Sequence, residues 1–250
     1  MPEGIDENMT ILKTNDGRML TPPKTLEPIL KSAFSAFYKM IGHIRFFYTA
    51  DEIWDGKAEL IYEANGKELA AVTIDNGFFN ICIANNNFKV TEDASLDAVY
   101  KALKNTATSN QRRPQEQLDA NLDEYPSGIR CDLCLGNKLF LEKGFVNNQH
   151  FDIMCRHAYG DEKGWDDTVG DNKGGWCNGR QGCYEKTLPC LEEKGFKNCL
   201  ECGEYHTCGN CGVGHEPSEC NLGLTAEEIT NLIIPYCEIE RLDLMGEERR

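Results

Sequence analysis

The chain has 250 residues, of which 40% are hydrophobic and 27% are charged, and its formal net charge is −15. This length suits one large domain or two ordinary ones. The negative charge repels phosphate backbones and anionic lipid, which disfavours nucleic acid or a membrane surface as the partner of the whole molecule. The opening MPEGIDENMTILKTNDGR lacks the basic and apolar regions of a signal peptide, and no run reaches the roughly 20 apolar residues that span a bilayer. We therefore expect a cytoplasmic protein without membrane association.

The cysteines divide the chain into two parts. Of 13 cysteines, only Cys82 precedes residue 131. A reducing cytoplasm and an odd number of cysteines both disfavour a complete set of disulfides. The composition predicts a polar lead-in over residues 1–24, a folded domain over 25–108, a polar linker over 109–130, and a cysteine-rich domain over 131–250 with a C-terminal helix.

The first domain shows helical and strand patterns in turn. Apolar residues recur at helical spacing over 25–41, with Thr25 as a candidate N-cap and Gly42 as a candidate C-terminal stop. Four β-branched or aromatic runs follow: IRFFYTA, KAELIYEA, KELAAVTI and FFNICIA. Asn65-Gly66 predicts a hairpin between the second and third runs, because both residues tolerate positive φ. A second amphipathic helix, SLDAVYKALKN, completes a predicted α+β fold with a small antiparallel sheet and flanking helices.

The second domain is mostly loops, with short helices predicted around YEKTLPCLEEKG and TAEEITNLIIPYCEIERL. Thr225 and Glu228 form a capping-box pattern, and Pro235 is expected to kink or end the last helix. Large apolar residues are few here, so bound metal is expected to act as a staple.

Three CxxC pairs indicate metal binding, because two such pairs commonly supply the four thiolates of a structural zinc site. The candidate ligands are Cys131, Cys134, Cys177, Cys183, Cys190, Cys199, Cys202, Cys208 and Cys211. The last four of these could form one site. Alternatively the pairs could be crossed, with Cys131 and Cys134 completing the site of one pair and Cys177, Cys183 or Cys190 completing another. We expect about two zinc ions per chain. An iron–sulfur cluster is the alternative, although the ferredoxin cysteine spacings are absent.

The remaining reactive side chains do not point to a reaction. Cys82 and Cys237 lie in apolar segments and are expected to be core thiols. Cys155-Arg156-His157 offers a thiol beside a base, although sequence neighbours rarely face each other productively. The sequence leaves open whether Cys155, Cys220, His157, His206 or His215 takes part in the metal sites. No phosphate-binding loop, nucleophile elbow or HExxH motif is present, so no catalytic residue is assigned.

Two stretches resemble known families. RFFYTADEIWDGKAELIYEANGKELAAVTIDNGFFNICI resembles the bacterial domain of unknown function 3788, and CDLCL with WCNGRQGCYEKTLPCLEEKGFKNCLECGEYHTC resembles the cysteine-rich domain of unknown function 3795. The second resemblance implies a module whose paired cysteines bind metal, and neither implies an activity. We expect a structural zinc module in a protein that binds a small molecule or another protein. The alternative is an iron–sulfur or thiol-based redox protein or enzyme that uses the cysteine cluster.

Overall fold

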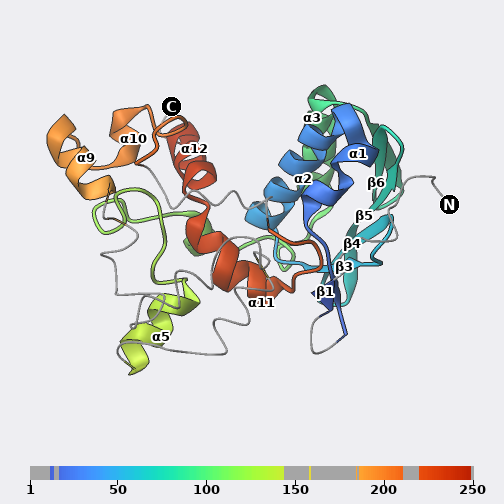
Figure 1. The fold of residues 1–250 in the computed structure, drawn as a ribbon, viewed down its shortest axis with the longest axis horizontal. Helices are drawn as coiled ribbons and strands as arrows, with labels where there is room; N and C mark the ends of the chain where they lie inside the picture. Colours follow the sequence, from blue (N-terminus) through green and yellow to red (C-terminus); the bar gives the residue numbers. More distant parts are fainter. Residues whose placement is uncertain are drawn as a thin grey trace. The chain divides into compact units, whose positions relative to one another are not determined.

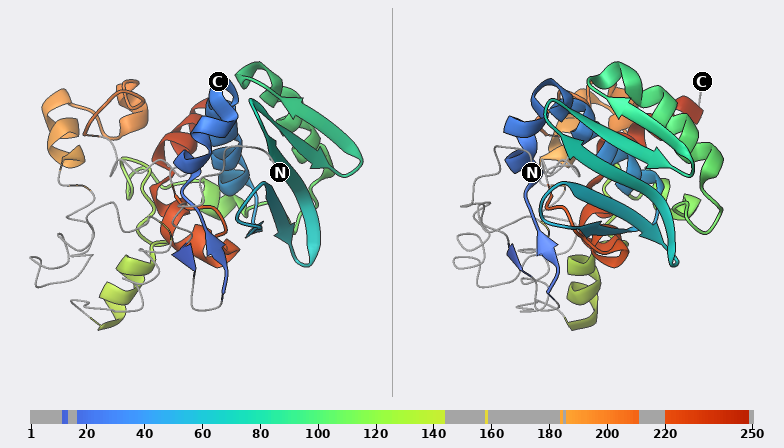
Figure 2. Two further views of the ribbon diagram at one scale, coloured as in Figure 1. Left: turned by 45° about the vertical axis from the view of Figure 1, so that its right-hand side comes forward. Right: turned by 90° about the vertical axis from the view of Figure 1, so that its right-hand side faces the viewer.

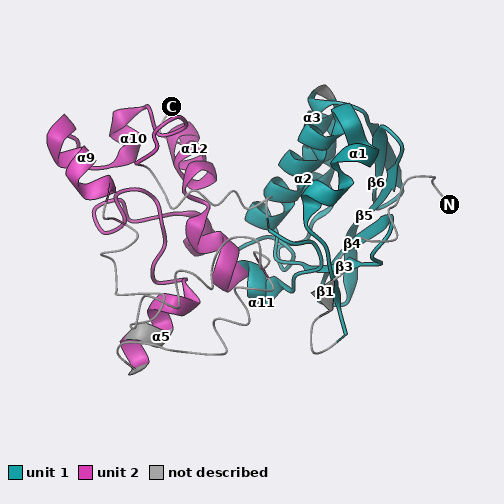
Figure 3. Ribbon diagram, viewed as in Figure 1, with its two compact units in different colours: residues 1–113, 218–229 teal, residues 114–217, 230–250 magenta. Residues whose placement is uncertain are grey.

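The computed structural model describes residues 12–13, 17–143, 158, 184, 186–210 and 220–248 of the chain. The chain forms two compact units, coloured separately in Figure 3. Unit 1 comprises residues 1–113 and 218–229, and unit 2 comprises residues 114–217 and 230–250. The structure therefore divides the chain within the stretch expected to be a linker, and it returns a short late segment to the first unit. In the described parts, no helix has the length and apolar character that crossing a membrane requires.

Unit 1 has the expected α+β architecture (Figure 1). A two-stranded ribbon precedes a five-stranded sheet, and short 3₁₀ segments, η1 to η3, adjoin the helices. The elements are β1 (Leu12–Lys13), β2 (Met19–Leu20), η1 (Pro23–Leu26), α1 (Glu27–Leu30), η2 (Lys31–Ala33), α2 (Phe34–Phe47), β3 (Asp51–Trp54), β4 (Glu59–Ala64), β5 (Lys67–Asp75), β6 (Phe78–Ile83), β7 (Asn86–Val90), η3 (Asp93–Ser95), α3 (Leu96–Thr106) and α11 (Ala226–Glu228).

The large sheet is an antiparallel meander in the order β3-β4-β5-β6-β7. Its strands alternate between buried and more exposed side chains, as expected of a sheet with one face against a core. Helices α2 and α3 lie on the buried face (Figures 1 and 2). The predicted hairpin at Asn65-Gly66 is confirmed: φ is 53° at Asn65 and 69° at Gly66. This register carries Leu60, Val72 and Ile81 into the core.

One predicted strand is wrong, and two strands of the large sheet were not predicted; nor was the ribbon of β1 and β2, which lies in the expected lead-in. Most of IRFFYTA belongs to helix α2, which runs through Gly42 to Phe47 instead of stopping at Gly42. The helix continues because Ile44 and Phe46 extend its buried side, and their burial outweighs the roughly 1 kcal/mol that a glycine costs in a helix. Thr25 lies inside η1 and caps no α-helix. Strands β3 and β7 form the two edges of the sheet.

A buried ion pair joins residues 220–224 to the body of unit 1. The Arg45 and Glu52 side chains are 0% exposed and form a bidentate pair, with both N–O distances 2.8 Å. The Arg45 guanidinium also donates to the Asn221 carbonyl at 2.7 Å and to the Cys220 carbonyl at 3.3 Å. Glu52 Oε2 accepts the Gly223 N–H at 3.2 Å. The pair therefore bonds to backbone that follows it by about 170 residues.

We call residues 220–228 the return segment. Leu222 forms a bridge with Thr21, and the Glu52 N–H donates to the Leu224 carbonyl at 2.8 Å, so the segment lies along β3. Gly223 has φ +91°, and a Cβ there would lie 2.4 Å from the Met19 carbonyl oxygen, so this position requires glycine. The predicted capping box of Thr225 and Glu228 is confirmed.

Unit 2 contains short helices joined by turns. Its described elements are α4 (Gln115–Leu118), α5 (Leu135–Lys143), α9 (Thr187–Lys194), α10 (Cys199–Cys202), the 3₁₀ turn η7 (Ile234–Tyr236) and α12 (Glu238–Glu248). The π-helical stretch η6 (Ile229–Ile233) follows α11. The final helix is interrupted at Pro235 as predicted: this residue lies within the 3₁₀ turn η7, and α12 starts at Glu238.

A buried arginine organises unit 2. Arg241 of α12 is 0% exposed, and its guanidinium donates to the carbonyls of Gly128 at 2.7 Å, Ile234 at 2.8 Å and Gln117 at 3.2 Å. These hydrogen bonds join helix α4 and the turn at Gly128 to the last helical segments of the chain. A small apolar cluster surrounds this region: Ala120, Leu122, Tyr125, Ile129, Cys131, Tyr184, Leu191, Cys199 and Leu242. Residues expected to form a linker are thus part of a core.

Replacing Glu52 by Gln should destabilise unit 1 by about 3 kcal/mol, because it leaves the buried Arg45 charge without an ionised partner. Chemical unfolding followed by circular dichroism measures the loss. The matched control is Asp93→Asn, which breaks the exposed Lys39–Asp93 pair and should change stability by less than about 1 kcal/mol. Equal effects of the two substitutions would contradict the role of the buried pair.

Unit 2 should lose stability as the pH rises. Burial raises the pKa of the Glu238 carboxyl to about 8 from its usual 4.5. Between these two pKa values, the folded state keeps a proton that the unfolded state has released. The protonated Glu238 carboxyl therefore makes its full contribution to the stability of unit 2 below pH 4.5, and this contribution is lost as the pH rises to 8. Glu238→Gln should remove this loss and stabilise unit 2 by up to about 4 kcal/mol at pH 8. Unfolding curves at pH 6 and pH 8.5 test this; parallel pH dependence of variant and wild type would contradict it.

Candidate metal centre

Four of the predicted ligands line one small pocket in unit 2. Cys190 lies on α9, Cys199 and Cys202 are the first and last residues of α10, and Cys208 lies in the following loop. Cys199 is 5% exposed, while the other three are partly exposed. The remaining lining residues are Thr187, Leu191, Tyr205 and Asn210. Three consecutive segments of chain thus bring four thiols to one place.

Local sequence explains how the two helices meet at the pocket. Helix α9 ends at Gly195, which has the left-handed φ of 70°, and the Phe196 N–H bonds the Leu191 carbonyl at 3.0 Å. Asn198 is the N-cap of helix α10, and its side chain accepts the Glu201 N–H at 3.1 Å. The turn from Gly195 to Asn198 folds α10 back beside α9 (Figure 1). Cys190 therefore lies near the CxxC pair of α10.

Side-chain contacts hold the loop that carries Cys208. The Thr187 hydroxyl donates to the Asn210 carbonyl at 2.7 Å, which joins the end of the loop to the start of α9. The Tyr205 hydroxyl and His206 Nε2 both lie 2.9 Å from Asp243 Oδ1 on α12. His206 thus bonds a carboxylate of α12, and it is absent from the pocket lining.

The pocket has room for about one ion, but the four cysteine sulfurs around it are not arranged about a common centre. Its volume of about 10 Å³ is close to that of one water-sized sphere. Among the residues that the structure describes, no three His, Cys, Asp or Glu side chains are close enough to hold a metal ion. The donor set and the space fit a tetrathiolate site, while the spacing of the sulfurs requires them to move together to bind an ion.

Lys194 is a cation beside this pocket that the sequence analysis did not single out. Its Nζ donates to Cys202 Sγ at 3.7 Å and to Glu204 Oε2 at 2.6 Å. The hydrogen bond to Glu204 raises the pKa of Lys194, and the Cys202 and Cys190 sulfurs raise it further. One feature of the sequence could have identified Lys194: it follows Cys190 by four residues within a predicted helix, and this spacing places both side chains on one helical face.

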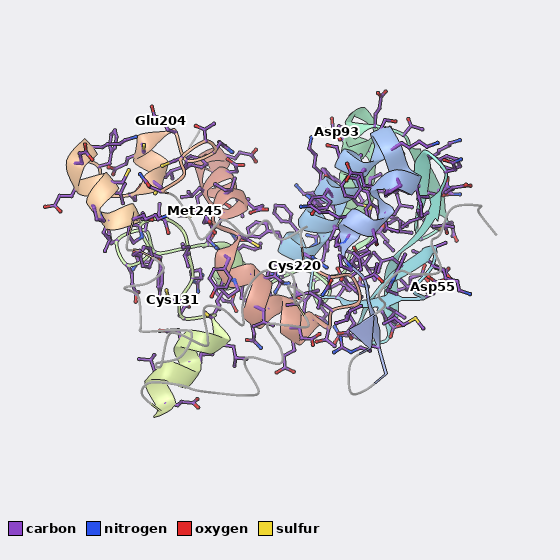
Figure 4. The ribbon with its side chains drawn as sticks, in the orientation of Figure 1. Asp55, Asp93, Cys131, Glu204, Cys220 and Met245 are labelled. Carbon is purple, nitrogen blue, oxygen red and sulfur yellow. The ribbon has the colours of Figure 1, made fainter. Side chains whose placement is uncertain are left out.

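The first CxxC pair lies elsewhere in unit 2. Cys131 and Cys134 flank a tight turn before α5, in which the Cys134 N–H bonds the Cys131 carbonyl at 3.2 Å. Figure 4 shows Cys131 well apart from Glu204, which follows α10. Burial raises the pKa of the Cys134 thiol, opposed by the Tyr236 hydroxyl 3.2 Å from its sulfur and by the N–H groups of Asn137 and Gly136. This pair therefore does not complete the α9–α10 pocket.

The other candidate residues fall into three groups. Cys237 is 0% exposed and is a core thiol, as predicted. Cys82 is only half-buried and donates to the Ala84 carbonyl at 3.4 Å, so the core prediction is wrong for it: its side of β6 faces away from the helices. Cys220 is buried in unit 1, within the return segment. The residues that lie outside the described part of the chain are Cys155, Cys177, Cys183, Cys211, His157 and His215.

Comparison of the chain with family models, curated proteins and solved structures found no match. The two family resemblances stay predictions, and the case for a function rests on the geometry of unit 2.

Proposed function

We propose that the chain is a metal-binding protein in which Cys190, Cys199, Cys202 and Cys208 hold one divalent ion, with zinc as the metal. The observation that carries this proposal is the convergence of four cysteines, from two helices and one loop, on a single pocket of ionic size. Zinc favours four sulfur ligands in structural sites. Binding would draw the four sulfurs together and fix α9, α10 and the loop after them.

The cysteine spacings favour a single ion over an iron–sulfur cluster, because the ferredoxin spacings are absent from the chain. The CxxC pairs are instead the arrangement that commonly supplies the thiolates of structural zinc.

The first CxxC pair is a poor candidate for disulfide chemistry. Cys82, Cys134, Cys190, Cys202 and Cys208 are free thiols. A reactive dithiol needs an accessible sulfur of low pKa, but Cys131 and Cys134 are only 5% and 7% exposed, and burial raises the pKa of Cys134. A reducing cytoplasm, which keeps thiols available as ligands, is the compartment that suits this proposal.

The ion would have a structural role. Unit 2 has its own small apolar cluster and the Arg241 network, so metal would add to an existing core. Its main effect would fall on α9 and α10, because Cys190, Cys199 and Cys202 lie on them. Once ordered, helices α9 and α10 would offer a surface for a protein or small-molecule partner. The sequence predicts about two ions per chain, and this site would hold one of them.

The proposal predicts that Cys202→Ser removes one metal ion per chain. Metal analysis of anaerobically purified protein gives the number of ions, and cobalt substitution should produce the intense visible bands and the sulfur-to-cobalt charge-transfer band of a tetrahedral thiolate site. The variant should lose these bands, and limited proteolysis should then cleave within α9 and α10 while unit 1 stays intact. Serine cannot replace a thiolate ligand at neutral pH.

The matched control is Cys82→Ser, a half-buried cysteine of unit 1 whose bond to the Ala84 carbonyl a hydroxyl can also make. It should keep the metal content of the wild type. Iron with acid-labile sulfide in the wild type, or equal metal content in Cys202→Ser and the wild type, would contradict the proposal.

A further inference from the structure

The Lys194 ammonium group contacts both a cysteine sulfur of the pocket and the carboxylate of Glu204. Lys194 follows Cys190 by four residues in the last turn of α9. Its Nζ lies 2.6 Å from Glu204 Oε2 and 3.7 Å from Cys202 Sγ. Glu204 itself lies two residues after Cys202, so one ammonium group joins α9 to both the end of α10 and the residue beyond it.

A four-thiolate site carries excess negative charge. A divalent ion with four thiolates has a formal charge of −2, in a chain whose net charge is already −15. Cys202 is one of the partly exposed cysteines of the pocket, so solvent-borne electrophiles and competing chelators reach it more readily than Cys199. A cation that hydrogen-bonds to this sulfur withdraws electron density from it and lowers its nucleophilicity.

We propose that Lys194 is a positioning residue of the metal site: held by Glu204, it donates to the Cys202 sulfur, offsets part of the thiolate charge and protects that ligand from attack. This inference rests on the proposed metal-binding function. Helices α9 and α10 supply the lysine and the cysteine, and Glu204 fixes the ammonium group between them.

A simple surface ion pair is the competing explanation for these contacts. The Lys194 and Glu204 side chains are 36% and 68% exposed, and such pairs contribute little to stability. An ion pair of this kind has no effect on the chemistry of Cys202. The two explanations therefore differ in the reactivity of one sulfur, which can be measured without reference to stability.

The test uses full-length, zinc-loaded protein. Iodoacetamide alkylation of Cys202 is followed by mass spectrometry of peptides, and zinc release is followed with a colorimetric chelator. Lys194→Gln should raise both rates about tenfold, the change expected from losing one hydrogen bond to a charged group. Lys194→Arg, which keeps the charge and the donors, should stay within about twofold of the wild type.

Lys197→Gln is the control for net charge, because Lys197 is an exposed lysine of the same hairpin and its loss changes the charge equally. It should react like the wild type. Equal rates for Lys194→Gln and Lys197→Gln in zinc-loaded protein would overturn the proposed role of Lys194 but not the proposed metal site. A wild-type chain that binds no zinc would overturn both this inference and the proposed function.

Discussion

The ion pair of Arg45 and Glu52 is the interaction on which the path of the chain depends. Removing two charges from water costs several kcal/mol for each ion, so a fully buried pair is tolerated only when its remaining donors and acceptors are also satisfied. Here they are satisfied by the return segment, through the Asn221 carbonyl and the Gly223 N–H. Unit 1 is therefore complete only when the chain, having passed through the cysteine-rich region, comes back to it.

Unit 2 uses a similar device on a smaller scale. Arg241 is buried among backbone carbonyls, and the nearby Glu238 carboxyl is kept neutral by burial, which raises its pKa to about 8. Such a polar interior, with a modest apolar cluster, leaves a narrow margin of stability. A metal ion at the α9–α10 pocket would add binding free energy where the chain has few apolar contacts. The thiolates would supply the negative charge that such an ion needs, and Lys194 would offset part of the excess.

Local patterns in the sequence predicted the parts of the fold that local physics decides. Three of the four predicted strand runs, the Asn65-Gly66 turn and the Thr225–Glu228 capping box appear as predicted. The sequence failed where long-range packing decides: IRFFYTA has strand propensity, but burial of Ile44 and Phe46 keeps it helical. The CxxC spacing identified candidate ligands, but it could not select Cys190 as their companion, since that depends on α10 folding back beside α9. No motif marked Lys194 as a neighbour of the cysteines or indicated that residues 220–224 return to unit 1.

X-ray absorption spectroscopy at the zinc edge tests the central claim most directly. With one equivalent of zinc bound to the full-length chain, four sulfur neighbours at about 2.3 Å are predicted. Loss of this shell in Cys202→Ser would assign it to the four thiols of the pocket. A first shell composed mainly of nitrogen or oxygen at about 2.0–2.1 Å would contradict the account, because the α9–α10 pocket offers its four thiols as the ligands.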